Sequence, residues 1–116
     1  MQSLIEKHTF IICVSVGIIS ILAGWFMLKF PPKEINHLYG YRTKSSMKNR
    51  DRWKFAQTYS AHQMIRLGLV LTVFGIISPA FPLSGMADMM VGLAAMILIF
   101  VILFFRVEKA IKENFK

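Results

Sequence analysis

The sequence contains a run of 19 residues without a charged side chain, from Phe10 to Leu28. At about 1.5 Å per residue, a helix of that length reaches about 28 Å, close to the hydrocarbon thickness of a bilayer. Lys29 and the Pro31–Pro32 pair end the run. Of the 116 residues, 55% are hydrophobic and 17% are charged, and a short soluble domain cannot bury that much apolar surface. The sequence therefore predicts a membrane protein and excludes an ordinary soluble enzyme.

Two further apolar runs predict two further spanning helices. The run that starts at Leu67 is interrupted by Pro79 and Pro82, so the second helix is expected to begin before it and to end in a turn. The third run lies between Asp88 and Arg106. We therefore predict an all-α integral membrane fold that forms a single domain over residues 1–116. Its expected parts are spans at about 10–28, 62–79 and 88–105, with a connecting loop at 29–61.

Lysine and arginine are unevenly distributed among the segments outside the spans, and their distribution sets the expected orientation. The N-terminal segment holds only Lys7, and the segment between the second and third spans holds none. Residues 29–66 carry Lys29, Lys33, Arg42, Lys44, Lys48, Arg50, Arg52, Lys54 and Arg66. The N-terminus is therefore expected outside the cell membrane, and the loop and C-terminus in the cytoplasm. The net charge of +8 then indicates cytoplasmic loops rather than nucleic-acid binding.

Six of the seven glycines form pairs that are seven residues apart. This spacing keeps both members on one helix face, and small residues allow helices to approach closely in a bilayer. We therefore expect helix packing at Gly17, Gly24, Gly68, Gly75 and Gly92. Gly85, which lies seven residues before Gly92, fits a helix position and also the turn before the third span. Because glycine is common in spanning helices, chance spacing remains an alternative.

The second half of the loop predicts an amphipathic helix with a basic polar face. Ser45 or Ser46 is placed to cap it. Its less polar residues fall within an arc of about 80°: Asn49, Trp53, Ala56, Ser60 and Met64. We expect this helix to lie in the cytoplasmic headgroup region before the second span begins. The residues expected to contact lipid phosphate are Arg50, Arg52, Lys54 and Arg66.

The sequence predicts no metal, cofactor or catalytic residue. Zinc-binding spacings are missing, and Ser45 and Ser46 lack the spaced His and Asp partners of a triad. The single cysteine, Cys13, lies within the first span and can form no intramolecular disulfide. We interpret Asp88 as an acid at the start of the third helix. The alternative is a carboxylate pair of Asp88 and Glu6 outside the cell.

The loop sequence INHLYGYRTKSSMKNRDRWKFAQTYSA resembles the signature of the SdpI family of small bacterial membrane proteins. The matching positions are Asn36, Tyr39, Gly40, Tyr41, Arg42, Thr43, Ser46, Asn49, Trp53, Ala56 and Gln57. The family's arrangement, with one span before the motif and two after it, covers essentially the whole chain. SdpI is an immunity protein of a spore-forming Gram-positive cell. It protects against a secreted toxic peptide that acts on the membrane, and it holds an autorepressor at the membrane when the toxin is present.

The resemblance implies a non-enzymatic membrane protein of a Gram-positive bacterium that binds or neutralises a peptide toxin. It covers only the three-span half that carries the motif, so the repressor-holding role is not expected to transfer. Two alternatives stay open. One is a signalling or assembly subunit that recruits a cytoplasmic partner, such as a repressor, through the basic loop. The other is a small intramembrane enzyme that acts on a peptide. Its candidate residues are Glu34, His37, Tyr39, Arg42 and Asn49 inside the cell, or Asp88 with Glu6 outside. Besides the lipid bilayer, a second copy of the chain is a compatible partner.

Overall fold

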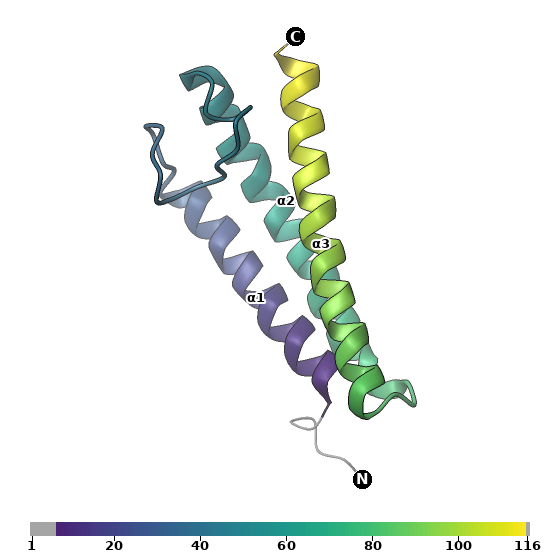
Figure 1. The fold of residues 1–116 in the computed structure, drawn as a ribbon. Helices are drawn as coiled ribbons and strands as arrows, with labels where there is room; N and C mark the ends of the chain where they lie inside the picture. Colours follow the sequence, from purple (N-terminus) through teal and green to yellow (C-terminus); the bar gives the residue numbers. More distant parts are fainter. Residues whose placement is uncertain (1–6, 116) are drawn as a thin grey trace.

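The computed structural model describes residues 7–115, and three long helices make up most of it (Figure 1). They are α1 (His8–Lys29), α2 (Arg50–Ile77) and α3 (Gly85–Asn114), and a 3-10 turn, η2 (Ser78–Ala80), follows α2. All three helices are long and apolar enough to cross a membrane, and residues 7–115 contain no strand. The prediction of an all-helical, multi-pass membrane protein is confirmed.

The bundle has two ends that differ in composition. One end holds residues 30–49, the start of α2 and the end of α3, and we call it the loop end (Figure 1). The opposite end holds the start of α1 and the connection between α2 and α3, and we call it the turn end. With 28 and 30 residues, α2 and α3 reach about 42 and 45 Å, against a hydrocarbon core of about 30 Å. Their excess length carries the charged residues and therefore projects at the loop end.

The separate interfacial helix expected before the second span is absent from the described residues. Instead, α2 runs as one helix from Arg50, and its N-cap is Asn49, whose side-chain oxygen accepts a hydrogen bond from the Arg52 N–H at 2.8 Å. Ser45 and Ser46, the predicted caps, lie in the turn that precedes it. The residues expected on the membrane side of that helix, among them Trp53, Ala56 and Ser60, are buried in the protein. The amphipathic pattern is real, but its less polar face packs on protein rather than lipid.

α1 and α2 approach each other closely at glycines. A Cβ atom built at Gly17 would lie 2.8 Å from the carbonyl oxygen of Gly68, and one at Gly68 would lie 2.7 Å from that of Gly17. At Gly24 the nearest atom is the Ala61 carbonyl oxygen at 2.6 Å, and at Gly75 it is an α1 side-chain atom at 2.9 Å. The two backbones are in direct contact, so any side chain at these positions would force the helices apart.

α3 has one glycine contact of this kind. A Cβ atom at Gly92 would meet the Cα of Thr9 at 3.1 Å, so Gly92 faces the start of α1. Gly85 differs from the other glycines, because it has a φ of +60° and no atom within 4 Å of the built Cβ. This position opens α3 in a left-handed conformation that favours glycine. Gly85 is therefore the first residue of α3, directly after the turn, and it contacts no other helix through that face.

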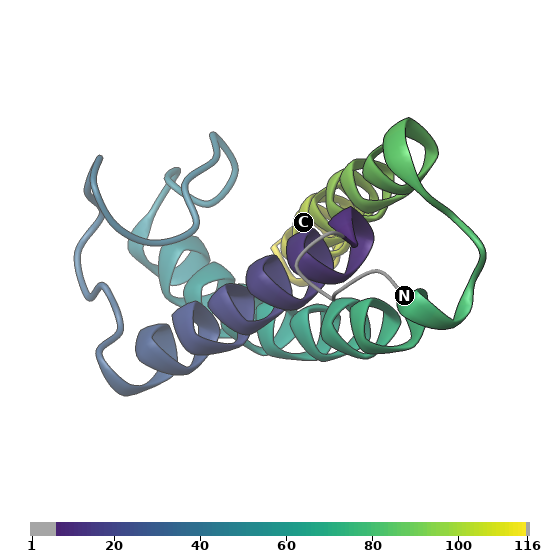
Figure 2. The same ribbon diagram turned by 90° about the horizontal axis from the view of Figure 1, so that it is seen from below.

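α1 and α3 lie together at the turn end and diverge toward the loop end (Figures 1 and 2). One apolar cluster joins all three helices and consists of Cys13, Leu67, Leu71 and Ile99. A second cluster, at the loop end, consists of Ala56, Val107 and Ile111 and has no residue from α1. The loop residue Tyr41 packs on this second cluster. The connecting loop therefore takes the place of α1 against α2 and α3.

Replacing Gly17 with Leu tests the close approach of α1 and α2. We expect Gly17→Leu to lower the free energy of unfolding by about 1–3 kcal/mol, because the added side chain overpacks a backbone contact. The control is Ala94→Leu, which adds a side chain at an exposed position on α3 and is expected to change stability by less than about 0.5 kcal/mol. Thermal unfolding in detergent measures both, and equal stability of the two variants would contradict the packing account.

Candidate functional site

The loop between α1 and α2 is irregular, so its backbone N–H and C=O groups need partners outside a helix. Gln57, on α2 and only 2% exposed, supplies two of them. Its Oε1 accepts a hydrogen bond from the Tyr41 N–H at 2.6 Å, and its Nε2 donates one to the Tyr41 carbonyl at 2.8 Å. One amide side chain therefore pairs with both backbone groups of one loop residue and fixes the loop on α2.

Gly40 and Trp53 hold the same part of the loop against α2. Gly40 has a φ of +106°, and an added Cβ would lie 2.8 Å from the Pro32 ring, so both conformation and space require glycine. The Trp53 side chain is fully buried, and its indole N–H donates a hydrogen bond to the Pro32 carbonyl at 2.6 Å. The loop therefore closes over α2 at two points on either side of the Gly40 turn.

The first part of the loop is tied to the end of α1. The Asn36 side-chain oxygen accepts hydrogen bonds from the Leu38 and Tyr39 N–H groups at 2.9 and 2.7 Å, which forms a local turn. The Tyr39 hydroxyl donates to the Phe30 carbonyl at 2.7 Å. The Arg42 guanidinium donates to the His37 carbonyl. These contacts define the path of the chain as it leaves α1.

Ser46 organises the second part of the loop. Its side chain is fully buried, and its Oγ accepts a hydrogen bond from the Thr43 N–H at 2.9 Å. The same Oγ lies within donating distance of the Tyr41 and Thr43 carbonyls, at 3.2 and 3.0 Å. Ala56 lies buried in the cluster on which Tyr41 packs. With Asn49 capping α2, all eleven motif positions now have a place in the loop or beneath it.

Glu108, which the sequence reasoning did not single out, joins the loop to α3. The hydroxyls of Tyr41 and Thr43 donate hydrogen bonds to its Oε2 at 2.7 and 3.0 Å, and the Ser45 hydroxyl donates to its Oε1 at 2.6 Å. The signal in the sequence is an acid between Arg106 and Lys109, just beyond the third span, in a chain with few acids. We call Glu108 with these three hydroxyls the carboxylate clamp.

The clamp keeps the Tyr41 hydroxyl in its neutral, donating form. Burial raises the pKa of the Tyr41 phenol above its ordinary value, and the hydrogen bond to Glu108 and the negative charge of that carboxylate raise it further. At neutral pH the phenol is therefore a donor to the carboxylate.

The four predicted lipid-phosphate residues fall into two groups. Arg50 forms an ion pair with Glu34 at 2.9 Å, and both side chains are exposed. Arg52 donates to the Phe115 carbonyl at 2.8 Å and lies over the Phe115 ring. Lys54 and Arg66 are exposed, and neither makes a hydrogen bond or ion pair within residues 7–115.

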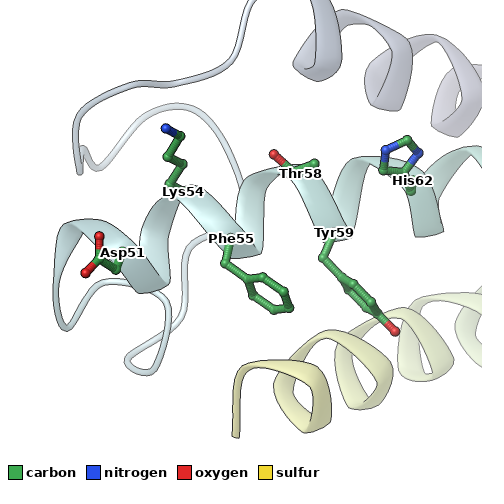
Figure 3. A pocket seen from close by; sticks show the side chains of 6 residues that line it. All are labelled: Asp51, Lys54, Phe55, Thr58, Tyr59 and His62. Carbon is green, nitrogen blue, oxygen red and sulfur yellow. The ribbon is translucent and has the colours of Figure 1, made fainter. Parts of the chain in front are cut away.

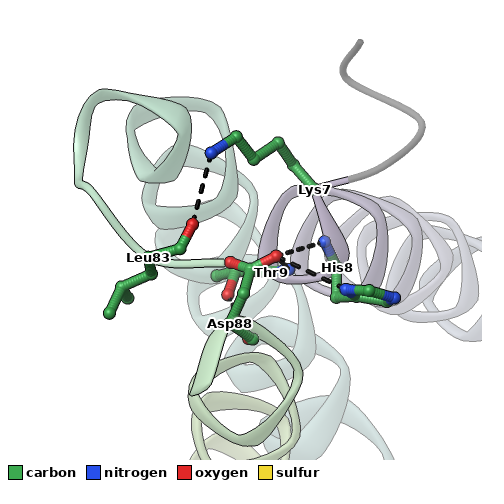
Figure 4. Close-up of polar contacts among 5 residues, drawn as sticks. All are labelled: Lys7, His8, Thr9, Leu83 and Asp88. Carbon is green, nitrogen blue, oxygen red and sulfur yellow. Dashed lines mark hydrogen bonds and ion pairs between the residues drawn. The ribbon is translucent and has the colours of Figure 1, made fainter. Parts of the chain in front are cut away.

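At the turn end, Asp88 connects α3 to α1 (Figure 4). It lies in the first turn of α3, as predicted, but its buried carboxylate accepts hydrogen bonds from the His8 and Thr9 N–H groups at 2.5 and 3.3 Å. The Thr9 hydroxyl donates to the Asp88 carbonyl at 2.6 Å, and the Lys7 amine donates to the Leu83 carbonyl at 3.2 Å. Asp88 thus caps α1, a helix other than its own. Glu6, its predicted alternative partner, lies outside the described residues.

The residues named for an intramembrane enzyme are distributed over separate contacts. Glu34 pairs with Arg50, Asn49 caps α2, and Arg42 contacts only the backbone of His37 among the polar groups of residues 7–115. No group of three His, Cys, Asp or Glu side chains in the described part of the chain lies close enough to hold a metal ion. The arrangement is a scaffold that fixes the loop on α2 and α3.

The raised pKa of Tyr41 predicts a pH dependence of the loop. Because the pKa is higher in the folded chain than in the unfolded chain, the contribution of Tyr41 to stability is complete below pH ~10 and is lost as pH rises further. We expect protease cleavage of the loop to accelerate above that pH in the native sequence. In Tyr41→Phe we expect faster cleavage already at pH 7 and a weaker pH dependence. Tyr59→Phe is the control, and a dependence unchanged in Tyr41→Phe would contradict this role.

Comparison with known proteins places this loop in a family. Residues 33–106 match the sequence model of the SdpI/YfhL protein family, so the match includes the whole motif and the carboxyl-terminal pair of helices up to Arg106. The chain is 40% identical over 96 residues to "Uncharacterized protein YfhL" of Bacillus subtilis (strain 168), which covers 83% of this chain and 82% of that protein. No solved structure matches the chain. The resemblance read from the motif is confirmed, and the chain belongs to the SdpI/YfhL family.

Proposed function

We propose that this chain is an SdpI-like immunity protein, which protects its cell from a secreted membrane-active peptide by binding or neutralising it at the membrane. The observation that carries the proposal is the family match over residues 33–106. SdpI has this protective role, and the resemblance of the motif implies the same role for this chain. The proposal omits the repressor-holding role of SdpI, because the resemblance concerns only the three-span half.

The contacts of the motif support a role in shaping the bundle rather than in a reaction. The polar groups of Gln57, Trp53 and Asn36 are engaged with backbone atoms of the loop. The Glu108 carboxylate is engaged with three hydroxyls. A nucleophile and its base would need to face each other with room for a substrate. These polar groups of the motif instead form hydrogen bonds with the loop backbone and with Glu108.

In this proposal the N-terminus and the turn end face outside, where a secreted peptide arrives. The turn end exposes large apolar side chains on α2, on α3 and in the connection between them, among them Val73, Ile77, Phe81, Met86 and Met90. A peptide that lies in the membrane as an amphipathic helix can pack its apolar face on such a surface. The role that we assign to the carboxylate clamp is to fix α2 and α3 relative to each other, so that this surface persists.

A protection assay tests the proposal. The chain is expressed in a Gram-positive strain that is sensitive to the peptide toxin against which SdpI protects, with SdpI and an empty vector as references. We expect the native sequence to restore growth. We expect Glu108→Ala to restore much less, because it removes the acceptor of three hydrogen bonds and costs about 2 kcal/mol in loop stability.

The matched control is Glu113→Ala, which removes an exposed acid from the same helix and is expected to protect like the native sequence. Membrane levels of every variant are measured in parallel by immunoblot. Growth equal to the empty vector at a normal membrane level of the native chain would contradict the proposed immunity. Recovery of cleaved toxin from a resistant culture would point to the enzyme alternative instead.

A further inference from the structure

At the loop end, the exposed surface of α2 and α3 carries basic side chains that take no part in the motif contacts. On α2 they are Lys54, His62 and Arg66, and all three are exposed. On α3 they are Arg106 and Lys109, which are exposed as well. We call these five residues the basic face. Within residues 7–115, Arg106 is the member that makes a hydrogen bond, and the other four have no polar partner.

Two shallow hollows shape this face and meet at Tyr59. The first, about 440 Å³ in volume, lies along α2 and is lined by Asp51, Lys54, Phe55, Thr58, Tyr59 and His62. The rings of Phe55 and Tyr59 point toward α3, whereas Lys54 and His62 lie on the opposite side of the helix (Figure 3). The second hollow, about 300 Å³, lies between α2 and α3 and is lined by Tyr59, Arg106, Lys109, Ala110 and Glu113. Tyr59 is therefore shared by two hollows, one with basic groups from α2 and one with basic groups from α3.

The height of this face relative to the membrane follows from one contact. The Arg106 guanidinium donates a hydrogen bond to the Gln63 side chain at 3.2 Å, so the two residues lie at one height. Arg106 directly follows the last apolar run, which places that height at the edge of the hydrocarbon. Arg66 lies three residues further along α2, about 4–5 Å on the apolar side. An exposed guanidinium at this depth is costly unless it reaches an anion.

We propose that the basic face binds an anionic phospholipid of the leaflet at the loop end, with its phosphate at Arg66 and Arg106. Charge favours an anion, because four basic residues and two acids, Asp51 and Glu113, line the two hollows, and Arg66 adds a further positive charge beside them. The depth of Arg66 favours a lipid over a soluble acid, since a phosphate whose acyl chains lie in the hydrocarbon reaches this depth without leaving its own environment. This proposal is independent of the immunity function.

Lipid binding to the purified chain tests the proposal. The full chain in a neutral detergent is titrated with phosphatidylglycerol and, separately, with phosphatidylcholine, and bound lipid is measured by native mass spectrometry. We expect phosphatidylglycerol to bind more tightly. Arg66→Gln is expected to weaken its binding about fivefold, a typical effect of one basic residue near an anionic lipid. Arg66→Lys is expected to retain most of it and guards against a folding defect.

The control variant is Lys44→Gln, which removes the same charge from an exposed loop position away from the basic face. It is expected to bind phosphatidylglycerol like the native chain. Equal affinity for the two lipids would overturn the proposal, and so would an equal loss in Lys44→Gln and Arg66→Gln, which would show only an effect of net charge. Displacement of the lipid by inorganic phosphate or by a polyglutamate peptide at comparable concentration would also overturn it, because the site would then take soluble anions.

Discussion

The carboxylate of Glu108 is the interaction on which the loop end of this protein depends. α1 diverges from α3 toward that end, so the two helices cannot hold each other there (Figures 1 and 2). An irregular loop fills the space, and such a loop is stable beside a membrane only if its polar groups find partners. Gln57 pairs with the backbone of Tyr41, and Glu108 accepts three hydroxyls from the same segment. The loop thereby links the end of α1 to both other helices.

At the turn end, a different carboxylate of α3, that of Asp88, joins the helices. There, α1 and α3 are adjacent, and the Asp88 carboxylate of one helix caps the first N–H groups of the other. Both ends thus use a carboxylate of α3 to hold an element that precedes it in the chain. Between them, the glycine contacts of α1 with α2 need no polar group, because close backbone packing stabilises helices in a bilayer. The bundle is therefore held by close apolar packing of α1 on α2 and by hydrogen bonds to one carboxylate of α3 at each end.

Much of the architecture could be predicted from single runs of sequence, because a spanning helix is a local property of about 20 residues. The apolar runs predicted the three helices, and the loop motif predicted the family. The prediction of a separate interfacial helix was wrong. The spacing of Trp53, Ala56 and Ser60 indicates a less polar helix face, but it does not distinguish a face covered by lipid from one covered by protein. Glu108 was missed because its partners lie more than 60 residues earlier in the chain. Contacts of that kind depend on how the helices pack, which no local pattern records.

Amide hydrogen exchange of the loop in lipid nanodiscs tests the central claim most directly. We expect the Tyr41 and Thr43 N–H groups, which donate to Gln57 and Ser46, to exchange slowly in the native chain. In Glu108→Ala we expect exchange at these two positions to be faster by about 10- to 30-fold, whereas exchange at the glycine contacts between α1 and α2 stays unchanged. Equal exchange in the two proteins would contradict the claim that this carboxylate holds the loop end together.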